Sequence, residues 1–229
     1  MIWGLARESD RQGALEQLSG LTARLQIDQV SCFSHLAVGP PMRLVRLVAR
    51  RGAAPAILVA APRAQAGLHP LGRALAEQAL EQTDLPLIVA PQRAEQGWSD
   101  SRALRMLVPL DGSSSAECAV PWSRLLGSAA ERDLLMLRVA PDGEARRLGD
   151  ARRYVEQQAS GSEVGLAVLG DPSTMILAVA RAHRVDVIVL TMHARDGQRQ
   201  PLLGHVIVRV LQHAHVPVLL VRPAGNRSC

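Results

Sequence analysis

An internal repeat constrains the fold of this 229-residue chain more than any other feature of its sequence. When the sequence is compared with itself at an offset of 131 residues, identical residues coincide without a gap. The coinciding pairs include Gly39 and Gly170, Ile57 and Ile188, Leu80 and Leu211, and Pro86 and Pro217. A register that holds over more than about fifty residues indicates a tandem duplication, so we expect two copies of one structural unit.

Short apolar runs alternate with segments of helical periodicity in the second copy. The runs predict strands at 104–110, 134–139, 185–191 and 217–221, and the periodic segments predict helices at 115–128, 145–158, 173–183 and 205–213. Asp171 is the expected N-cap of the third helix, with Pro172 at its first position. Ser114 and Glu117 form an expected capping box at the start of the first helix. The alternation predicts βαβ units around an open parallel sheet, with five strands in this complete copy, four of which have the bounds given above.

The first copy follows the same order but starts late. Its pattern predicts strands at Ile2–Ala6, 56–60 and 86–90 and helices at 42–51 and 72–82. Because Met1 aligns with Arg132, the opening strand and helix of the unit are missing. We expect either that the natural start lies upstream or that the first copy is a decayed, rearranged half. With the polar segment Gln92–Ala103 as the linker, the sequence predicts an incomplete domain at 1–95 and a complete one at 103–229.

Composition excludes several classes of function. The 26 basic residues are all Arg and face 21 acidic ones; they are scattered without a basic run, so we expect no nucleic-acid site. The longest apolar runs have the length of strands and are too short to span a membrane. Three cysteines without a C-x-x-C spacing argue against a disulfide framework. This favours a reducing compartment, and we expect a cytoplasmic protein.

Asp111 is the main candidate for a ligand contact. It ends a predicted strand at the carboxyl edge of the sheet, where open α/β folds bind ligands, and its carboxylate could accept hydrogen bonds from ribose or adenine. The alternative is a turn aspartate that accepts from neighbouring N–H groups. Ser113–Ser115 lack a G-x-S-x-G context, and His213 and His215 lack the companions of a metal site. We therefore expect neither a catalytic serine nor a metal centre.

Three segments of the second copy resemble the universal stress protein family, in its tandem type. They are LVPLDGS at 107–113, VIVLTMHAR at 187–195 and LLGHVIVRVLQHAHVPVLLVRP at 202–223. The resemblance covers the second copy and, more faintly, the first. It implies an α/β fold of the adenine nucleotide alpha hydrolase-like, Rossmann-like type, with two tandem open parallel-sheet repeats and sheet order 3-2-1-4-5 in the second. It also implies adenine-nucleotide binding in some members and pairing through the last strands.

Family members that bind nucleotide resemble one another in a loop of Gly, two residues, Gly, nine residues, Gly and then Ser or Thr. Small residues there let backbone N–H groups approach the phosphates at a helix N-terminus. On this chain the four positions are Thr191, Ala194, Gly204 and His205. Thr191 is expected to add a side chain where the ligand would sit. The equivalent positions of the first copy are Ala60, Arg63, Arg73 and Ala74, which keep nothing of the motif.

The resemblance therefore implies a single, degenerate nucleotide site in the second copy. Its residues are Pro109, Leu110, Asp111, Val139, Thr191, His193, Ala194, Arg195, Gly204, His205 and Val206. The implied ligand is ATP or AMP, with no metal beyond a nucleotide-bound Mg.

Two functions remain open. The first is an adenine-nucleotide-binding stress-response or signalling protein that is no enzyme beyond slow incidental ATP hydrolysis. The second is a scaffold of the same fold that has lost its ligand and acts through protein contacts. In both cases the expected partner is the chain itself or another stress-type protein, through the last-strand edges, and neither nucleic acid nor membrane.

Overall fold

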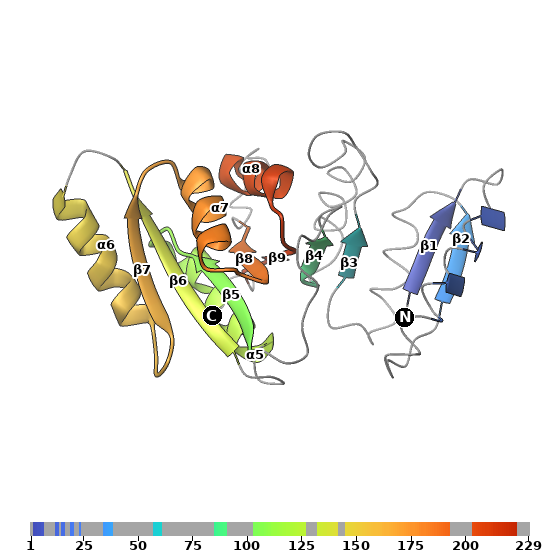
Figure 1. The fold of residues 1–229 in the computed structure, drawn as a ribbon, viewed down its shortest axis with the longest axis horizontal. Coiled ribbons are helices and arrows are strands. Elements are labelled where there is room, and N and C mark those ends of the chain that lie inside the picture. The colour runs from blue at the N-terminus through green and yellow to red at the C-terminus, as the bar shows by residue number, and fades with distance from the viewer. Residues whose placement is uncertain are drawn as a thin grey trace. The chain divides into compact units, whose positions relative to one another are not determined.

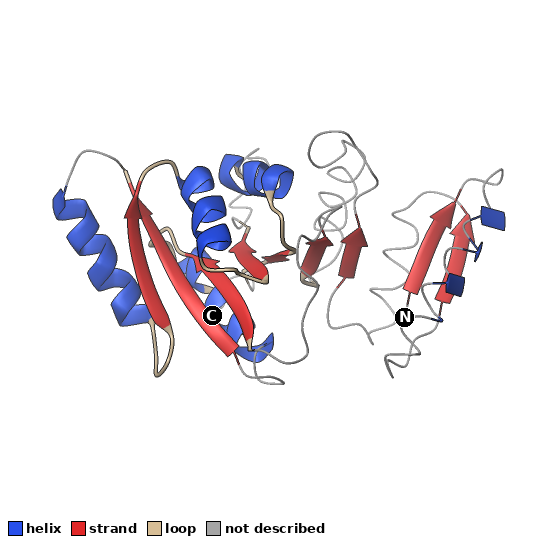
Figure 2. Cartoon of the chain, in the orientation of Figure 1, coloured by secondary structure: helices blue, strands red, loops and turns tan. Residues whose placement is uncertain are grey.

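The computed structural model describes the chain in separate stretches (Figures 1 and 2). These are residues 2–6, 34–38, 57–60, 85–90, 103–126, 132–141, 145–192 and 203–223, with isolated positions between 12 and 23. The chain divides into two compact units, Met1–Ala54 and Pro55–Cys229, and each is described by itself.

The larger unit is built on one seven-stranded sheet (Figure 1). Its strands are β3 (Ile57–Ala60), β4 (Leu87–Ala90), β5 (Leu104–Pro109), β6 (Arg132–Ala140), β7 (Val164–Leu169), β8 (Val187–Thr191) and β9 (Val218–Val221). Their order across the sheet is β3-β4-β9-β8-β5-β6-β7. All neighbours are parallel except β4 and β9. From β7 to β9 the order is 3-2-1-4-5, as predicted, whereas the sheet as a whole is mixed rather than parallel.

The helices of this unit agree with the sequence prediction except at the first. They are α4 (Ser114–Glu117), α5 (Ala119–Leu126), α6 (Ala145–Gln158), α7 (Pro172–Ala182) and α8 (His205–His213). The helix predicted at 115–128 is divided at Cys118. Pro121 explains the division, because it has no N–H to donate and its ring clashes with the carbonyl four residues earlier. As the third residue of α5, it sits where a helical N–H has no intrahelical acceptor anyway.

The predicted capping box at Ser114 is wrong by one residue. Ser113 is the N-cap of α4, and its Oγ accepts a hydrogen bond of 3.1 Å from the N–H of Ala116. Because the helix starts one residue early, Glu117 lies beyond the position from which it would reach back to the cap. The N-cap predicted at Asp171 is confirmed: its Oδ1 accepts from the N–H of Thr174 at 2.9 Å, and Pro172 opens α7.

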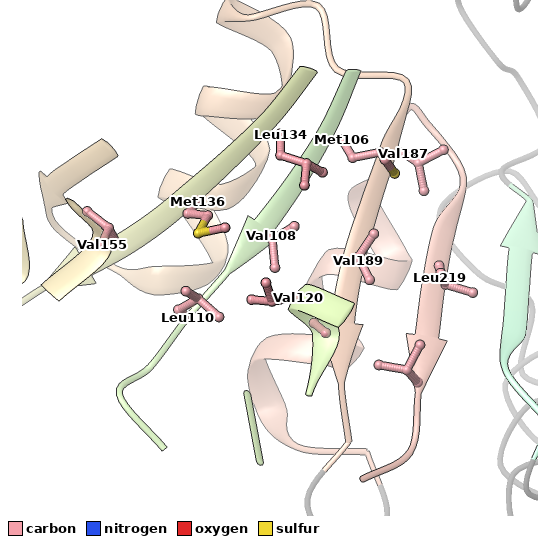
Figure 3. Packing of buried hydrophobic residues seen from close by; sticks show 12 residues of the cluster. Met106, Val108, Leu110, Val120, Leu134, Met136, Val155, Val187, Val189 and Leu219 are labelled. Atoms are coloured by element: carbon pink, nitrogen blue, oxygen red, sulfur yellow. The ribbon is translucent and has the colours of Figure 1, made fainter. Parts of the chain in front are cut away.

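An aliphatic core fills the face of the sheet that α5 and α6 cover (Figure 3). Alternate residues of the strands point into it, and Ala119, Val120 and Val155 join them from the helices. The strand residues are Met106, Val108, Leu134, Met136, Val187, Val189, Leu219 and Val221. Trp122 and Tyr154 pack at its margin. Helices α7 and α8 pack on the other face, so the part of the sheet formed by the second copy is covered on both sides, as its apolar strands require (Figure 1).

The antiparallel seam between β4 and β9 has the geometry of a two-fold axis. Leu87 pairs with Leu220, Ile88 with Leu219 and Val89 with Val218. In the 131-residue offset Leu219 is the counterpart of Ile88, so the axis passes between these two residues. The strands predicted at 86–90 and 217–221, the last of each copy, therefore lie side by side around a pseudo-two-fold axis. Since β4 and β9 each have a partner on both sides, the expected pairing through last-strand edges is satisfied within the chain.

The register of the parallel strands also follows the repeat. Leu58 pairs with Ile88 in β3 and β4, and Val189 pairs with Leu219 in β8 and β9. These two pairs are related by the same offset of 131 residues, as are the other pairs of both ladders. The last two strands of the copies are therefore paired identically.

The smaller unit contains one described sheet of two parallel strands, β1 (Ile2–Ala6) and β2 (Ser34–Val38). The strand predicted at Ile2–Ala6 is confirmed. The predicted helices at 42–51 and 72–82 and nearly all of the linker lie outside the described residues. The domain ranges 1–95 and 103–229 stay a prediction.

Two further features bear on the expected compartment. Cys118 is disulfide-bonded, and its partner lies outside the described residues. An odd cysteine count says nothing about which thiols a fold brings together, so it no longer supports a reducing compartment. In the described stretches, no helix has the length and hydropathy of a membrane span.

Candidate functional site

The candidate site lies where the strand order reverses. The chain runs from β5 outward to β6 and β7 on one side, and from β8 to β9 on the other, while β5 and β8 are parallel neighbours. Their carboxyl ends therefore meet at one edge, followed by Asp111 and Met192 respectively. Open α/β sheets bind ligands at this crevice. The fold thus brings Pro109, Leu110, Asp111 and Thr191 to the same edge.

Asp111 belongs to a tight turn at residues 110–113, here called the Asp111 turn. Its Oδ1 accepts hydrogen bonds from the N–H of Ser113 at 2.9 Å and from the Ser113 hydroxyl at 2.5 Å. Gly112 has a φ of +84°, a conformation that side chains rarely adopt. The same Ser113 hydroxyl accepts from Ala116 and starts α4. Asp111 therefore has the turn role that the sequence left open, and its contact with a ligand stays a prediction.

Arg138 and Tyr154 lie against the Asp111 turn. Nη1 of Arg138 donates to the carbonyl of Leu110 at 3.2 Å, and the guanidinium lies 5.9 Å from the centroid of the Tyr154 ring. The Tyr154 hydroxyl donates to Glu117 at 2.8 Å, and Gln158 donates to the same Glu117 oxygen at 3.1 Å. Burial raises the pKa of Tyr154 well above its usual range, and the hydrogen bond to Glu117 raises it further. Strand β6 and helix α6 together hold the turn and α4.

Thr191, at the first motif position, is engaged with α4. Its hydroxyl donates to the carbonyl of Ala116 at 3.3 Å. Along β8 it shares a face with Val187 and Val189, which belong to the core beneath α5 and α6. Its side chain therefore bridges β8 and the first turn of α4. The predicted conflict between this side chain and a nucleotide stays a prediction.

Helix α8 begins as the motif predicts. Gly204 is its N-cap, with no side-chain capping bond, and His205 is its first residue. By contrast, side chains of Ser113 and Asp171 cap α4 and α7. The partial positive charge of an uncapped helix N-terminus favours an anion.

The other predicted site residues separate into two groups. Val139 lies half-buried in β6, paired with Val168, on the face opposite to Arg138. Val206 lies half-buried in the first turn of α8. His193, Ala194 and Arg195 fall outside the described residues.

Sequence reasoning missed Arg138, Tyr154 and the role of Glu117. One signal was available: Arg138 interrupts the apolar run of β6 only two residues before the strand ends. A charged residue near the carboxyl end of a buried strand is a candidate for that edge of the sheet. Tyr154, the single tyrosine of the chain, gave no signal beyond its rarity.

An open, largely parallel sheet with order 3-2-1-4-5 and a polar turn at its switch point defines the adenine nucleotide alpha hydrolase-like class of α/β proteins. Within this class, residues 103–222 match the model of the Universal stress protein family, which is more than half of the chain, and the chain belongs to that family.

Solved structures share the fold over nearly the whole chain. A putative universal stress protein from Pseudomonas aeruginosa UCBPP-PA14 is 16% identical, with 96% of this chain and 81% of that chain covered and a TM-score of 0.69. A universal stress protein from Archaeoglobus fulgidus DSM 4304 is 15% identical, with 97% and 82% covered and a TM-score of 0.66. At such identities the likeness concerns the fold alone.

Proposed function

We propose that this member of the universal stress protein family binds an adenine nucleotide, ATP or AMP, at the switch point between β5 and β8. In this proposal the chain is a stress-response or signalling protein of the cytoplasm, built from two tandem repeats, with binding rather than catalysis as its function. The nucleotide lies between Asp111 and the segment from Thr191 to His205.

One observation carries the proposal. A hydrogen-bond acceptor and an anion-binding helix N-terminus follow two strands that are parallel neighbours in the sheet. Asp111 follows β5, and the uncapped α8 follows β8, the parallel neighbour of β5. A carboxylate suits ribose hydroxyls, and the N–H groups of a helix N-terminus suit phosphates. Val139, at the end of β6, suits an adenine ring as an apolar contact.

The substitutions in the loop weaken the site without removing its chemistry. If Ala194 adopts a positive φ, the cost is about 1–2 kcal/mol, which is small beside the roughly 8 kcal/mol of a micromolar complex. The His205 ring can donate a hydrogen bond in place of a serine hydroxyl. One solved universal stress protein was crystallised in complex with cAMP. That is a property of that protein, and the case for this chain rests on its own residues.

A scaffold without ligand is the second candidate, and Thr191 favours it. Its side chain replaces a glycine, and its hydroxyl already binds the carbonyl of Ala116. In this alternative the fold is retained for protein contacts.

Calorimetry with ATP separates the two. For the nucleotide binder, Asp111→Ala should weaken binding at least tenfold, about 1.4 kcal/mol. Because Asp111 also holds its turn, Asp111→Asn is the sharper probe: the amide oxygen still accepts from the N–H of Ser113 while the charge is lost. Asp150→Ala, an exposed carboxylate of α6, is the matched control and should leave affinity unchanged.

The double variant Ala194→Gly/His205→Ser restores two motif positions and should tighten binding. If the wild type gives no heat with millimolar ATP and the restored protein does, the scaffold function is correct. If neither protein binds ATP, the proposed site is refuted.

A further inference from the structure

We propose that Arg138 is the positioning residue of the Asp111 turn, held in place by the ring of Tyr154. As an account of nucleotide affinity the inference rests on the proposed function, whereas as an account of the turn it stands without a ligand.

The guanidinium of Arg138 bonds to one residue of the turn and lies next to the space beside another. Nη1 donates to the carbonyl of Leu110, the residue directly before Asp111. A Cβ built on Gly112, directly after Asp111, would stand 3.5 to 3.6 Å from three guanidinium atoms, which is ordinary van der Waals contact. One planar group therefore lies against both neighbours of the ligand-site carboxylate.

The ring of Tyr154 in turn restricts the position of the Arg138 guanidinium. The guanidinium lies over the Tyr154 ring, 5.9 Å from the centroid, in a cation–π arrangement. The ring has little freedom, because its hydroxyl is bonded to Glu117 and Glu117 is bonded to Gln158. Helix α6 thus supports the guanidinium, and the guanidinium supports the turn.

The hydrogen bond of Arg138 is directed to the backbone of the turn and not to a carboxylate. Among the ion pairs of the described residues, none involves Arg138. The nearby carboxylate of Glu117 accepts from Tyr154 and Gln158 instead. Arg138 donates to a carbonyl of the turn, as expected of a group that fixes backbone geometry before a ligand arrives.

Amide hydrogen exchange by NMR on the nucleotide-free, full-length protein tests the inference. Arg138→Met keeps an unbranched apolar stem and removes the donors and the charge. The Ser113 amide should then exchange about tenfold faster, while the amides of β5 and β6 keep their wild-type rates. Arg152→Met, an exposed arginine on α6, is the matched control and should change neither.

Three more variants separate positioning from general packing. Arg138→Lys restores the charge and one donor and should recover part of the protection at Ser113. Tyr154→Leu removes the ring and should act like Arg138→Met. Tyr154→Phe keeps the ring but loses the hydroxyl bond that restricts it, so its effect at the Ser113 amide should lie between wild type and Tyr154→Leu. Unchanged exchange at Ser113 in Arg138→Met, or equally faster exchange along β5 and β6, overturns the inference.

Affinity for ATP is measured on the same variants. If the wild type binds, Arg138→Met should weaken ATP binding about tenfold. If the wild type does not bind, the proposed function fails and the exchange data still decide whether Arg138 positions the turn. Binding that is unchanged in Arg138→Met, together with a loosened turn, would separate the turn from recognition and overturn the link to affinity.

Discussion

Replacing Arg124 by Met is expected to destabilise the larger unit by about 3 kcal/mol. Arg124, near the end of α5, makes a two-pronged contact with Glu163, just before β7: Nε donates to Oε1 at 2.9 Å and Nη2 to Oε2 at 2.7 Å. Nη2 also donates to the carbonyl of Gln158 at 3.1 Å. The pair thereby ties α5 to the turn between α6 and β7.

The magnitude follows from the unequal burial of the two partners. Only 6% of the Glu163 side chain is exposed, against 36% of Arg124. Breaking a buried pair costs about 3–5 kcal/mol, and the partly solvated arginine places the expected loss at the lower end. Most of the loss is the cost of leaving a charged carboxylate buried without its cation.

Two matched variants test that origin. Arg152→Met breaks a pair with Glu156 whose side chains are 74% and 55% exposed, and should cost less than about 0.5 kcal/mol. The double variant Arg124→Met/Glu163→Met removes the buried charge as well, so it should be more stable than Arg124→Met alone.

Urea denaturation followed by the fluorescence of Trp122 measures these differences. Trp122 lies two residues before Arg124 and packs at the margin of the core, so it reports on this region once Trp3 and Trp98 are replaced by Phe. With a slope of about 2 kcal/mol per molar urea, the midpoint should fall by about 1.5 M at unchanged slope. A loss in Arg124→Met no larger than in Arg152→Met, or a double variant less stable than the single, would refute the reasoning.

Two more predictions concern the strands and the single tyrosine. The amides of β4 should exchange as slowly as those of β9, because both strands are paired on both sides. The amides of β1 and β2, which form a two-stranded sheet, should exchange faster than those of residues 104–222. Equal protection of β1 and β2 would contradict this prediction. Ultraviolet titration of Tyr154, the only tyrosine, should show no phenolate at pH 10.0, the pH that equals the ordinary pKa of tyrosine. Burial and the hydrogen bond to Glu117 raise the pKa of Tyr154 above that value. A phenol whose pKa is raised by folding stabilises the fold fully below pH 10.0, and that contribution is lost as the pH rises through the raised pKa. Glu117→Gln should lower the pKa, and titration of the wild type near its ordinary value would contradict the burial argument.

The sequence predicted those parts of the fold that depend on local pattern and on the repeat. The bounds of α6 and β1 were predicted to the residue, and the expected pairing of the last strands is observed between β4 and β9, although its register came only from the structure. The start of α4 was missed by one residue, since three consecutive serines offer equivalent caps and only the fold selects Ser113.

Residues of the candidate site were predictable from the sequence only where a local motif lies at the ligand-binding edge of the sheet. Asp111 and Gly204 satisfy that condition, because one follows a strand at the switch point and the other opens a helix. Arg138 and Tyr154 do not, since their contacts with the Asp111 turn join residues from separate elements. No local pattern encodes such pairings.

The pairing of β4 with β9 explains why the first copy retains its last strands while only the second retains part of the loop motif. A bare β9 would present unpaired N–H and C=O groups along one side, which invites pairing with other chains. β4 covers that side, and β3 covers β4, with the same registers that join β8 and β9. Covering the edge of β9 requires apolar strands of matching length, and it requires none of the loop residues that bind a nucleotide. Ile57–Ala60 and Leu87–Ala90 meet the requirement, while Arg63 and Arg73 occupy places where glycine would be needed. The first copy is therefore explained as a structural complement of the second, and the nucleotide site that we propose is expected in the second copy alone.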